Sequence, residues 1–456
     1  MITVKKKIAL LMACITGCLF THSAYSANWL MLQGTEAHKQ GQAPRAHVWG
    51  FIQAQYQYDN SDPSLAPNPA GGYVPPKLIG PNLDDQSQFN VNRARIGVRG
   101  TGFPLDSKVN YFILAEFGNN GITYGDDGKH LTDASVTFNH IPGARVRVGQ
   151  FKYPGAEEGL QAIHVFDYIN FTSVTNQLLL ERFPTLNGES CTTTIDDSVS
   201  PPTATTSCTP VVQNQAPTPT PNAGMNQFDS SVGAFRDIGI QVFDMFKVSN
   251  WEHSYALMVG NGNGINSGDN DSNKDVYLYW SSELVFGGKG GRREGLKLFA
   301  WHQDGKRTKV DDRTQEQDRE RSGAGVKYLK KPFRATAEYM QGKGMIFQGQ
   351  HRPAHMFNNL EAAGYYVEGG WYIGKTNFEI DLRWDSYTRD ENHPTSQPGH
   401  ESTADTITLG GQYHFNKKTR VNLEYASRDY KSDTPAVNTQ QVGVDGRFAI
   451  QVTHIF

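Results

Sequence analysis

The stretch Asn377-Phe378-Glu379-Ile380-Asp381-Leu382-Arg383-Trp384-Asp385 alternates apolar and ionisable side chains without a break. Successive side chains of a β-strand point to opposite faces, so this segment has one apolar face and one charged face. A strand of a soluble β-sandwich also alternates, with its polar face in bulk water. A strand between lipid and a water-filled lumen shows the same pattern. This segment alone leaves both architectures open.

The same period of two recurs along the chain, and most of the segments have roughly the 9–13 residues that a tilted outer-membrane strand needs. For example, Val48, Ile52 and Tyr56 alternate with Gln53, Gln55 and Gln57. The expected strands are 46–58, 89–100, 105–118, 130–139, 143–152, 231–246, 251–261, 274–287, 294–304, 320–329, 332–342, 362–374, 376–387, 404–415, 418–429 and 445–456.

The connections between these segments alternate between short and long. Tight turns such as Val248–Asn250, Lys330–Lys331 and Asn416–Lys417 alternate with loops of about ten to nearly eighty residues. Short periplasmic turns and long extracellular loops are typical of outer-membrane barrels, and closure removes the sheet edges that lipid cannot solvate. The sequence therefore predicts an all-β fold, a transmembrane antiparallel β-barrel of about sixteen strands spanning 46–456.

Composition excludes several classes of function. Without residues 1–26 the chain has 40 basic and 46 acidic residues, a net charge of −6, which argues against nucleic-acid binding. No zinc-protease, phosphate-loop, nucleophile-elbow or C-x-x-C motif occurs, so we expect no enzyme activity, cofactor or metal. Asp269–Asp275 has carboxylates at alternate positions but lacks the glycine and glutamate of a calcium loop, which favours a solvated hairpin.

The N-terminus has the pattern of an export signal: a basic start, an apolar stretch Ile8–Phe20, and small residues before Ala27. We expect residues 1–26 to be a signal peptide and 27–45 to be a short periplasmic segment. A lipobox-like stretch ending at Cys18 is the alternative. Cleavage before Ala27 leaves Cys191 and Cys208, and two cysteines in an exported protein indicate one disulfide.

The last strand ends in an alternating aromatic pattern, with Phe448, Ile450, Val452 and His454 leading to the terminal Phe456. This pattern resembles the signature that outer-membrane barrels present to their insertion machinery. Phe456 is therefore the expected assembly signal.

Three stretches resemble the phosphate-selective porin O/P family of Gram-negative outer membranes: Phe89–Gly100, Ala144–Lys152 with the following Glu157–Leu160, and Arg236–Ile240. The Gly149-Gln150-Phe151-Lys152 segment is the most specific of them. The resemblance implies a sixteen-stranded, usually homotrimeric, water-filled pore in the outer membrane, in contact with lipid and lipopolysaccharide. Such pores pass small hydrophilic solutes and often favour anions such as phosphate.

In the family-like stretches the arginines occupy alternate positions, which lie on one face of each predicted strand. The candidates to face the lumen and attract anions are Arg93, Arg95, Arg99, Arg145 and Arg147, with Lys152 at the root of the next loop. Rings of Arg or Lys are one way in which pores select anions. An alternative of equal weight is that these arginines pair with lumenal acids such as Glu116, Asp133 or Asp237 and only brace the wall.

The connection 153–230 is too long for an ordinary loop and starts with apolar residues such as Phe166, Tyr168 and Phe171. We expect this third loop to fold inward and narrow the lumen, and its Thr- and Pro-rich later part, 191–222, to be mobile. The predicted function is a diffusion porin. A barrel that acts mainly in surface interaction, as an adhesin or phage receptor, is the alternative.

Overall fold

The computed structural model describes residues 29–32, 46–61, 83, 86–102, 105–120, 122–123, 131–181, 189–196, 203–210, 235–265, 269, 271–288, 292–308, 316–346, 361–389, 401–432 and 444–456. The predicted signal peptide, Cys18 and Ala27 lie outside these residues. Among the described residues no helix is both long and apolar enough to span a membrane.

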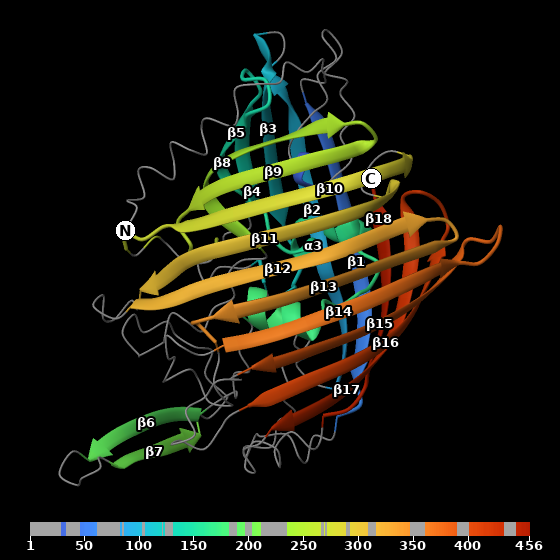
Figure 1. Ribbon diagram of the computed structural model, residues 1–456. Helices are drawn as coiled ribbons and strands as arrows, with labels where there is room; N and C mark the ends of the chain where they lie inside the picture. Colours follow the sequence, from blue (N-terminus) through green and yellow to red (C-terminus); the bar gives the residue numbers. More distant parts are fainter. Residues whose placement is uncertain are drawn as a thin grey trace.

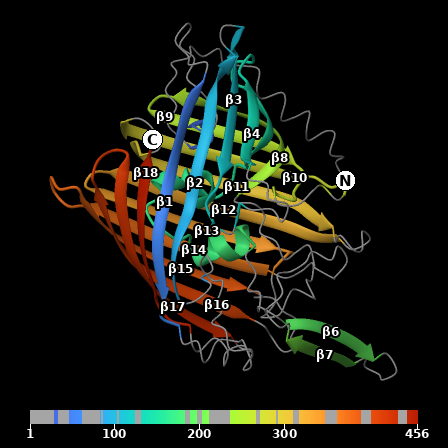
Figure 2. The same cartoon turned by 180° about the vertical axis from the view of Figure 1, so that it is seen from behind.

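Within the described ranges, sixteen antiparallel strands form one closed barrel (Figures 1 and 2). Strand β1 pairs with β18 from Phe51 opposite Ile455 to Asp59 opposite Arg447, which closes the sheet. The strands are β1 His47–Asp59, β2 Ser87–Gly102, β3 Asp106–Glu116, β4 Leu131–Phe138, β5 Arg145–Lys152, β8 Arg236–Val248, β9 Trp251–Gly260, β10 Asp275–Gly287, β11 Glu294–Thr308, β12 Glu316–Lys330, β13 Phe333–Lys343, β14 Glu361–Tyr372, β15 Phe378–Arg389, β16 Ser402–His414, β17 Thr419–Ser432 and β18 Arg447–Ile455. Every predicted strand is confirmed, with ends displaced by five residues or fewer.

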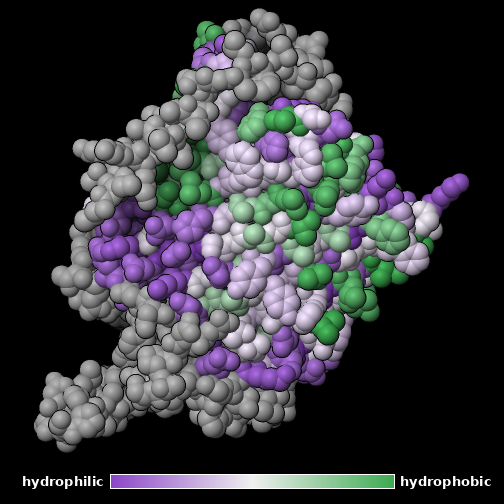
Figure 3. Space-filling view, viewed as in Figure 1, coloured by the Kyte–Doolittle hydropathy of each residue, from purple (hydrophilic) through white to green (hydrophobic). Residues whose placement is uncertain are grey.

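The apolar faces point outward and the charged faces point inward. In β15, Phe378 and Ile380 are 52% and 45% exposed, whereas Glu379 and Asp381 are each 1% exposed. In Figure 3, apolar and pale side chains spread across the wall of β9–β15 and hydrophilic ones gather at its left edge. A soluble sandwich would bury its apolar faces, so the outward-facing apolar wall identifies a barrel in lipid.

A β-bulge in β2 reverses the side-chain parity within one strand. The pairing with β1 passes from Gln53 opposite Arg93 to Ala54 opposite Val91, which leaves Asn92 without a partner in the register. Val91 therefore faces outward and is 49% exposed, while Arg93 faces inward and is 5% exposed, although both are odd-numbered. A bulge adds one residue to one strand, and this one keeps an apolar residue outside and an arginine inside.

The structure differs from the prediction in the later part of the third loop. Residues expected to be mobile form a two-stranded sheet, β6 Glu189–Asp196 with β7 Thr203–Pro210, which lies apart from the barrel in both views (Figures 1 and 2). Its strands are rich in threonine, a β-branched residue that favours extended backbone. The two strands contain few large apolar residues, so they lack the alternation that predicts the strands of the barrel.

The N-terminal segment also contains ordered structure. Helix α2, Trp29–Leu32, has buried side chains at Trp29, Leu30 and Met31, and these belong to the same apolar cluster as Phe166 and Leu178 of the third loop. Trp29, Leu30 and Met31 are thus packed against other apolar groups. This packing explains the run of apolar residues so close to a predicted mature N-terminus.

Candidate pore constriction

The start of the third loop, residues 153–181, folds into the barrel and is called here the inward loop. It contains helix α3 Glu157–Leu160 and two short helical turns, η1 Ile163–Val165 and η2 Thr175–Leu179. Figures 1 and 2 show its green helical turns inside the ring of strands. Phe166, Val174 and Leu180 are 0–1% exposed and form an apolar cluster with inward side chains of the wall such as Phe299 and Tyr366. These residues therefore pack against the inner wall of the barrel.

Glu157 fastens the beginning of the inward loop to strands β11 and β12. Its carboxylate accepts hydrogen bonds from the ammonium groups of Lys297 and Lys327, the latter at 2.9 Å. Burial alone would raise the pKa of Glu157, but the two ammonium groups hold this pKa at about 2. Glu157 is therefore ionised at every physiological pH, and the two ammonium groups compensate its negative charge.

Asp167 fastens the middle of the loop to the same wall, beside the short turns that follow β10 and β12. It pairs with Arg292, in the turn after β10, and its Oδ2 lies 3.2 Å from Nη1 of Arg334 on β13. Despite its burial, these guanidinium groups lower the pKa of Asp167 below its usual range. Arg334 also lies within 2.5 Å of Glu379, which extends the ion pair into a network across the inner wall.

Two further carboxylates complete the attachment. Glu181 pairs with Arg319 and with Arg321, the latter at 3.4 Å, both on β12. Glu158 accepts a 2.6 Å hydrogen bond from the Thr172 hydroxyl and lies 3.6 Å from Arg383. Burial raises the pKa of Glu158 to about 7. All four acidic residues of the inward loop thus contact basic groups between β10 and β15.

The predicted cations lie mainly on the other side of the inward loop, on β2 and β5. Arg95 pairs with Glu116 at 2.6 Å, Arg93 donates to the Gln53 amide at 3.1 Å, and Arg147 lies over the Phe243 ring at 4.5 Å. These three side chains are at most 5% exposed and face the barrel interior. Lys152 donates 2.7 Å hydrogen bonds to the carbonyls of Gly159 and Gln161, so it supports the turn of the inward loop.

Arg99 and Arg145 lie toward the periplasmic ends of their strands. Arg99 lies over the Trp49 ring at 5.9 Å, and Arg145 pairs with Asp244 at 3.3 Å with a side chain 20% exposed. The Trp49 ring also contacts His164 of the inward loop, so Arg99 lies near the loop. Anion attraction by any of the six stays a prediction.

His164 of the inward loop is buried among aromatic rings, close to several cationic side chains. Its ring contacts those of Trp49 and Phe51 at centroid distances of 5.7 and 5.1 Å. Burial, followed by the nearby charges of Arg420, Arg95, Lys152 and Arg99, lowers the pKa of His164 to about 3. The four charges that contribute most to this shift are all positive.

Sequence reasoning marked Glu157 and Glu158 only as part of a family-like stretch and assigned no partner to any of the four carboxylates of the inward loop. The alternation of apolar and polar residues in β11, β12 and β13 could have placed Lys297, Arg319 and Arg334 on the lumenal face of the sheet. The loop itself has no periodicity, so nothing in the sequence pairs Glu157 with Lys297 or Asp167 with Arg334.

Comparisons with known proteins agree with this geometry. The sequence profile of phosphate-selective porin O and P matches residues 80–177 and 301–451, more than half of the chain. No curated protein sequence matches significantly. Among solved structures, a loop-deletion mutant of OmpT of Vibrio cholerae has a TM-score of 0.50 at 11% identity, covering 90% of this chain and 99% of that one.

A second similar structure is Salmonella typhi OmpF in complex with daunomycin, with a TM-score of 0.50 at 12% identity, covering 90% of this chain and 97% of that one. Both structures support the fold alone. The outer-membrane channel DcaP of Acinetobacter baumannii has a TM-score of 0.49 at 12% identity, covering 90% and 97% of the two chains. With the family match over both halves of the barrel, the chain is an outer-membrane porin that belongs to the phosphate-selective porin O and P family.

Proposed function

We propose that this porin passes small hydrophilic solutes by passive diffusion and favours anions modestly. The observation that carries the proposal is an excess of positive charge on one inner wall. Beside the inward loop, β2, β5 and β8 bury five cationic side chains, Arg93, Arg95, Arg147, Lys152 and Arg236, against four carboxylates, Glu116 and Asp133 of β3 and β4 and Asp237 and Asp244 of β8. Arg95 pairs with Glu116, Arg236 pairs with Asp133, and Asp244 pairs with a further cation, Arg145.

The negative charges of the inward loop lie on its opposite side. Glu157, Glu158, Asp167 and Glu181 contact basic groups between β10 and β15 and are compensated there. The wall around His164 therefore has a net positive charge that the loop does not cancel. Low-dielectric walls strengthen the field of such charges, and rings of Arg or Lys select anions in other pores.

The test is the reversal potential of the purified porin in a planar bilayer with a KCl gradient. We expect an anion-leaning value for the wild type and a several-fold smaller ratio of chloride to potassium permeability for Arg93→Gln, Arg147→Gln, since each removed charge acts at short range on passing ions. A control double variant, Lys306→Gln, Lys431→Gln, removes the same charge from exposed side chains. An equal, cation-leaning value in all three proteins would show that the arginines only brace the wall.

Assembly as a homotrimer is part of the same proposal and follows from membership of the family. The outward faces of β1–β5 offer an apolar surface for it, with Ile96, Ile113 and Val148 each 43–49% exposed. The mass of the protein in mild detergent, measured by light scattering with detergent subtraction, tests the trimer. A mass equal to one chain would overturn it.

A further inference from the structure

The N-terminal segment contributes a short helix to the interior of the molecule. Helix α2, Trp29–Leu32, precedes the first strand of the barrel, and its Trp29, Leu30 and Met31 side chains are 7%, 3% and 1% exposed. They belong to one apolar cluster with Phe166 and Leu178 of the inward loop and with residues of the barrel wall. A segment that is not part of the wall is thus buried about as deeply as the inward loop.

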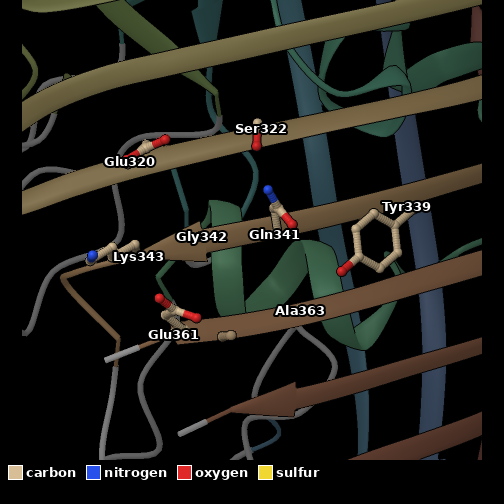
Figure 4. Close-up of a pocket in the computed structure, with 9 residues that line it drawn as sticks. Glu320, Ser322, Tyr339, Gln341, Gly342, Lys343, Glu361 and Ala363 are labelled. Carbon is tan, nitrogen blue, oxygen red and sulfur yellow. The ribbon is translucent and has the colours of Figure 1, made fainter. Parts of the chain in front are cut away.

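The cluster that buries α2 lies inside the barrel. Its wall members face inward: Phe51, Phe243 and Phe299 are 0–4% exposed, whereas Ile52, the neighbour of Phe51, faces outward and is 44% exposed. Outward side chains of the described strands are open to their surroundings, as is Tyr339, which is 50% exposed at a cavity of about 230 Å³ across β12–β14 (Figure 4). The burial of α2 therefore occurs on the lumenal side of the wall.

The connection of α2 to the wall indicates the end of the barrel from which it narrows the lumen. Strand β1 begins at the periplasmic rim, so α2 is joined to the wall at that rim. Trp49, Met245 and Ile455 lie at the periplasmic ends of β1, β8 and β18, and they pack against the same apolar cluster. The cluster thus extends from the inward loop toward the periplasmic mouth.

The forces that hold α2 differ from those that hold the inward loop. The loop is fastened by ion pairs, such as Glu157 with Lys297 and Asp167 with Arg334. The side chains of α2 carry no charge, so their contribution is the burial of apolar surface. Apolar groups in an aqueous pore also exclude the water through which ions and hydrophilic solutes move. Helix α2 therefore reduces the aqueous cross-section of the lumen without adding a charge to it.

We propose that α2 is a second constriction element, which narrows the lumen from the periplasmic side and, together with the inward loop, sets the size of the largest solute that passes. Trp29, Leu30 and Met31 are the residues that determine this limit. The proposal rests on the proposed function in diffusion and adds size selection to it. Because these three side chains are uncharged, they act on the size of the solute, whereas the cations beside the inward loop act on its charge.

The test combines single-channel conductance in a planar bilayer with the swelling of liposomes in neutral sugars of increasing size. One variant is Leu30→Gln, Met31→Gln, because amides that lose their hydrogen bonds to water in an apolar cluster are costly and release α2. The other variant lacks residues 29–32. In both, we expect the conductance to rise roughly twofold and larger sugars to enter, since water fills the freed space. The reversal potential should keep its wild-type value, because no charge changes.

The matched control is Leu105→Gln, which makes the same change at a 96% exposed leucine beside the periplasmic turn between β2 and β3. Its conductance and sugar limit should equal those of the wild type. The folding of each variant is checked by heat-modifiable mobility on gels. The start of each mature chain is checked by intact mass, since residues 29–32 lie close to the predicted cleavage site.

Wild-type conductance and an unchanged sugar limit in a folded deletion variant would overturn the proposal. A raised conductance in the deletion, together with a cation-leaning reversal potential in the wild type, would support the constriction and refute the proposed anion preference alone.

A labelling experiment keeps the proposal testable if the variants of α2 fold poorly. Met31→Cys and Leu105→Cys are compared in a background of Cys191→Ser, Cys208→Ser, using a hydrophilic maleimide on the intact porin. We expect roughly tenfold slower labelling at position 31, because a thiol buried in an apolar cluster is shielded and less ionised. Equal labelling rates at the two positions would overturn the lumenal burial of α2 and the proposal with it.

Discussion

Nη1 of Arg334 on β13 lies 3.2 Å from Oδ2 of Asp167 in the inward loop, in an ion pair that Arg292 shares from the turn after β10. The pair holds the middle of the inward loop against the barrel wall. Because both side chains are largely buried, their attraction is screened less than that of a surface pair. The position of the loop in the lumen therefore depends on a few such contacts.

The first prediction concerns this pair. Replacing Asp167 by Asn removes one buried negative charge and leaves Arg292 and Arg334 less compensated, a change that costs on the order of 3 kcal/mol for a buried pair. We expect noisier single-channel currents, because the loop is held less firmly, and a shift of the reversal potential toward anions. Asp269→Asn, at an exposed pair with Lys274, is the control. Unchanged current noise and selectivity in Asp167→Asn would contradict the role of Asp167 as an anchor.

The second prediction is a pH effect at Glu158, whose pKa burial raises to about 7 from 4.5. In the folded protein this carboxyl keeps its proton between about pH 4.5 and 7, while the unfolded chain loses it. The free energy of unfolding therefore falls as pH rises through this window, by about 3 kcal/mol at most. Glu158→Gln should remove this slope.

The same titration changes the charge beside the pore. Above about pH 7 Glu158 becomes negative, so the anion preference of the wild type should weaken between about pH 5.5 and 8.5. His164, whose pKa is about 3, stays neutral throughout and adds nothing to this change. Bilayer recordings across this range test the effect. An equal pH dependence in wild type and Glu158→Gln would rule out Glu158 as its source.

The third prediction is a disulfide between Cys191 and Cys208. These residues lie opposite each other in the register of β6 and β7. Opposite residues of an antiparallel pair have Cα atoms about 4.5–5.5 Å apart, which is within the range that a disulfide spans. For a loop of this size the cross-link contributes about 3 kcal/mol, confined to the hairpin. Mass spectrometry after alkylation without reductant should find no modified thiol, and two alkylated cysteines would refute the bond.

The fourth prediction is that deleting residues 189–210 distinguishes diffusion through the pore from surface interaction. Because β6 and β7 lie apart from the barrel, conductance and reversal potential should stay at the wild-type values in this deletion. An altered conductance would show that the hairpin takes part in the pore. Intact conductance with a loss of binding to cells or phage would support a separate role in surface interaction.

The sequence predicted the barrel well because its pattern is local. In each strand, such as Phe378–Arg389, lipid on one side and the lumen on the other impose a period of two that neighbouring residues display. The bulge at Asn92 escaped detection because it changes the parity without changing the composition. The predicted strand 89–100 lies within β2, and Arg93 and Arg95 after the bulge are each 5% exposed.

The constriction was much less predictable, since its contacts join distant parts of the chain. Lys152 could be placed at the root of the loop, but its bonds to the Gly159 and Gln161 carbonyls depend on a turn that has no repeating pattern. The pairing of Glu157 with Lys297 likewise needs the loop to be inside the barrel first. Such ion pairs result from the fold, and the residues that form them show no spacing that would reveal them beforehand.

The last prediction concerns barrel closure at Phe456. Its backbone N–H donates to the Gly50 carbonyl at 3.0 Å, and a Cβ on Gly50 would lie 2.3 Å from Cζ of Phe456 and 2.4 Å from the Arg95 carbonyl. Gly50→Ala and deletion of Phe456 should therefore both lower the yield of heat-modifiable barrel in outer-membrane fractions, since each disturbs the β1–β18 seam. Phe415→Ala, which removes another exposed aromatic ring near the periplasmic turns, should have little effect. If the deletion lowers the yield and Gly50→Ala does not, Phe456 acts as an insertion signal and not through this contact. A wild-type yield in both would refute either role.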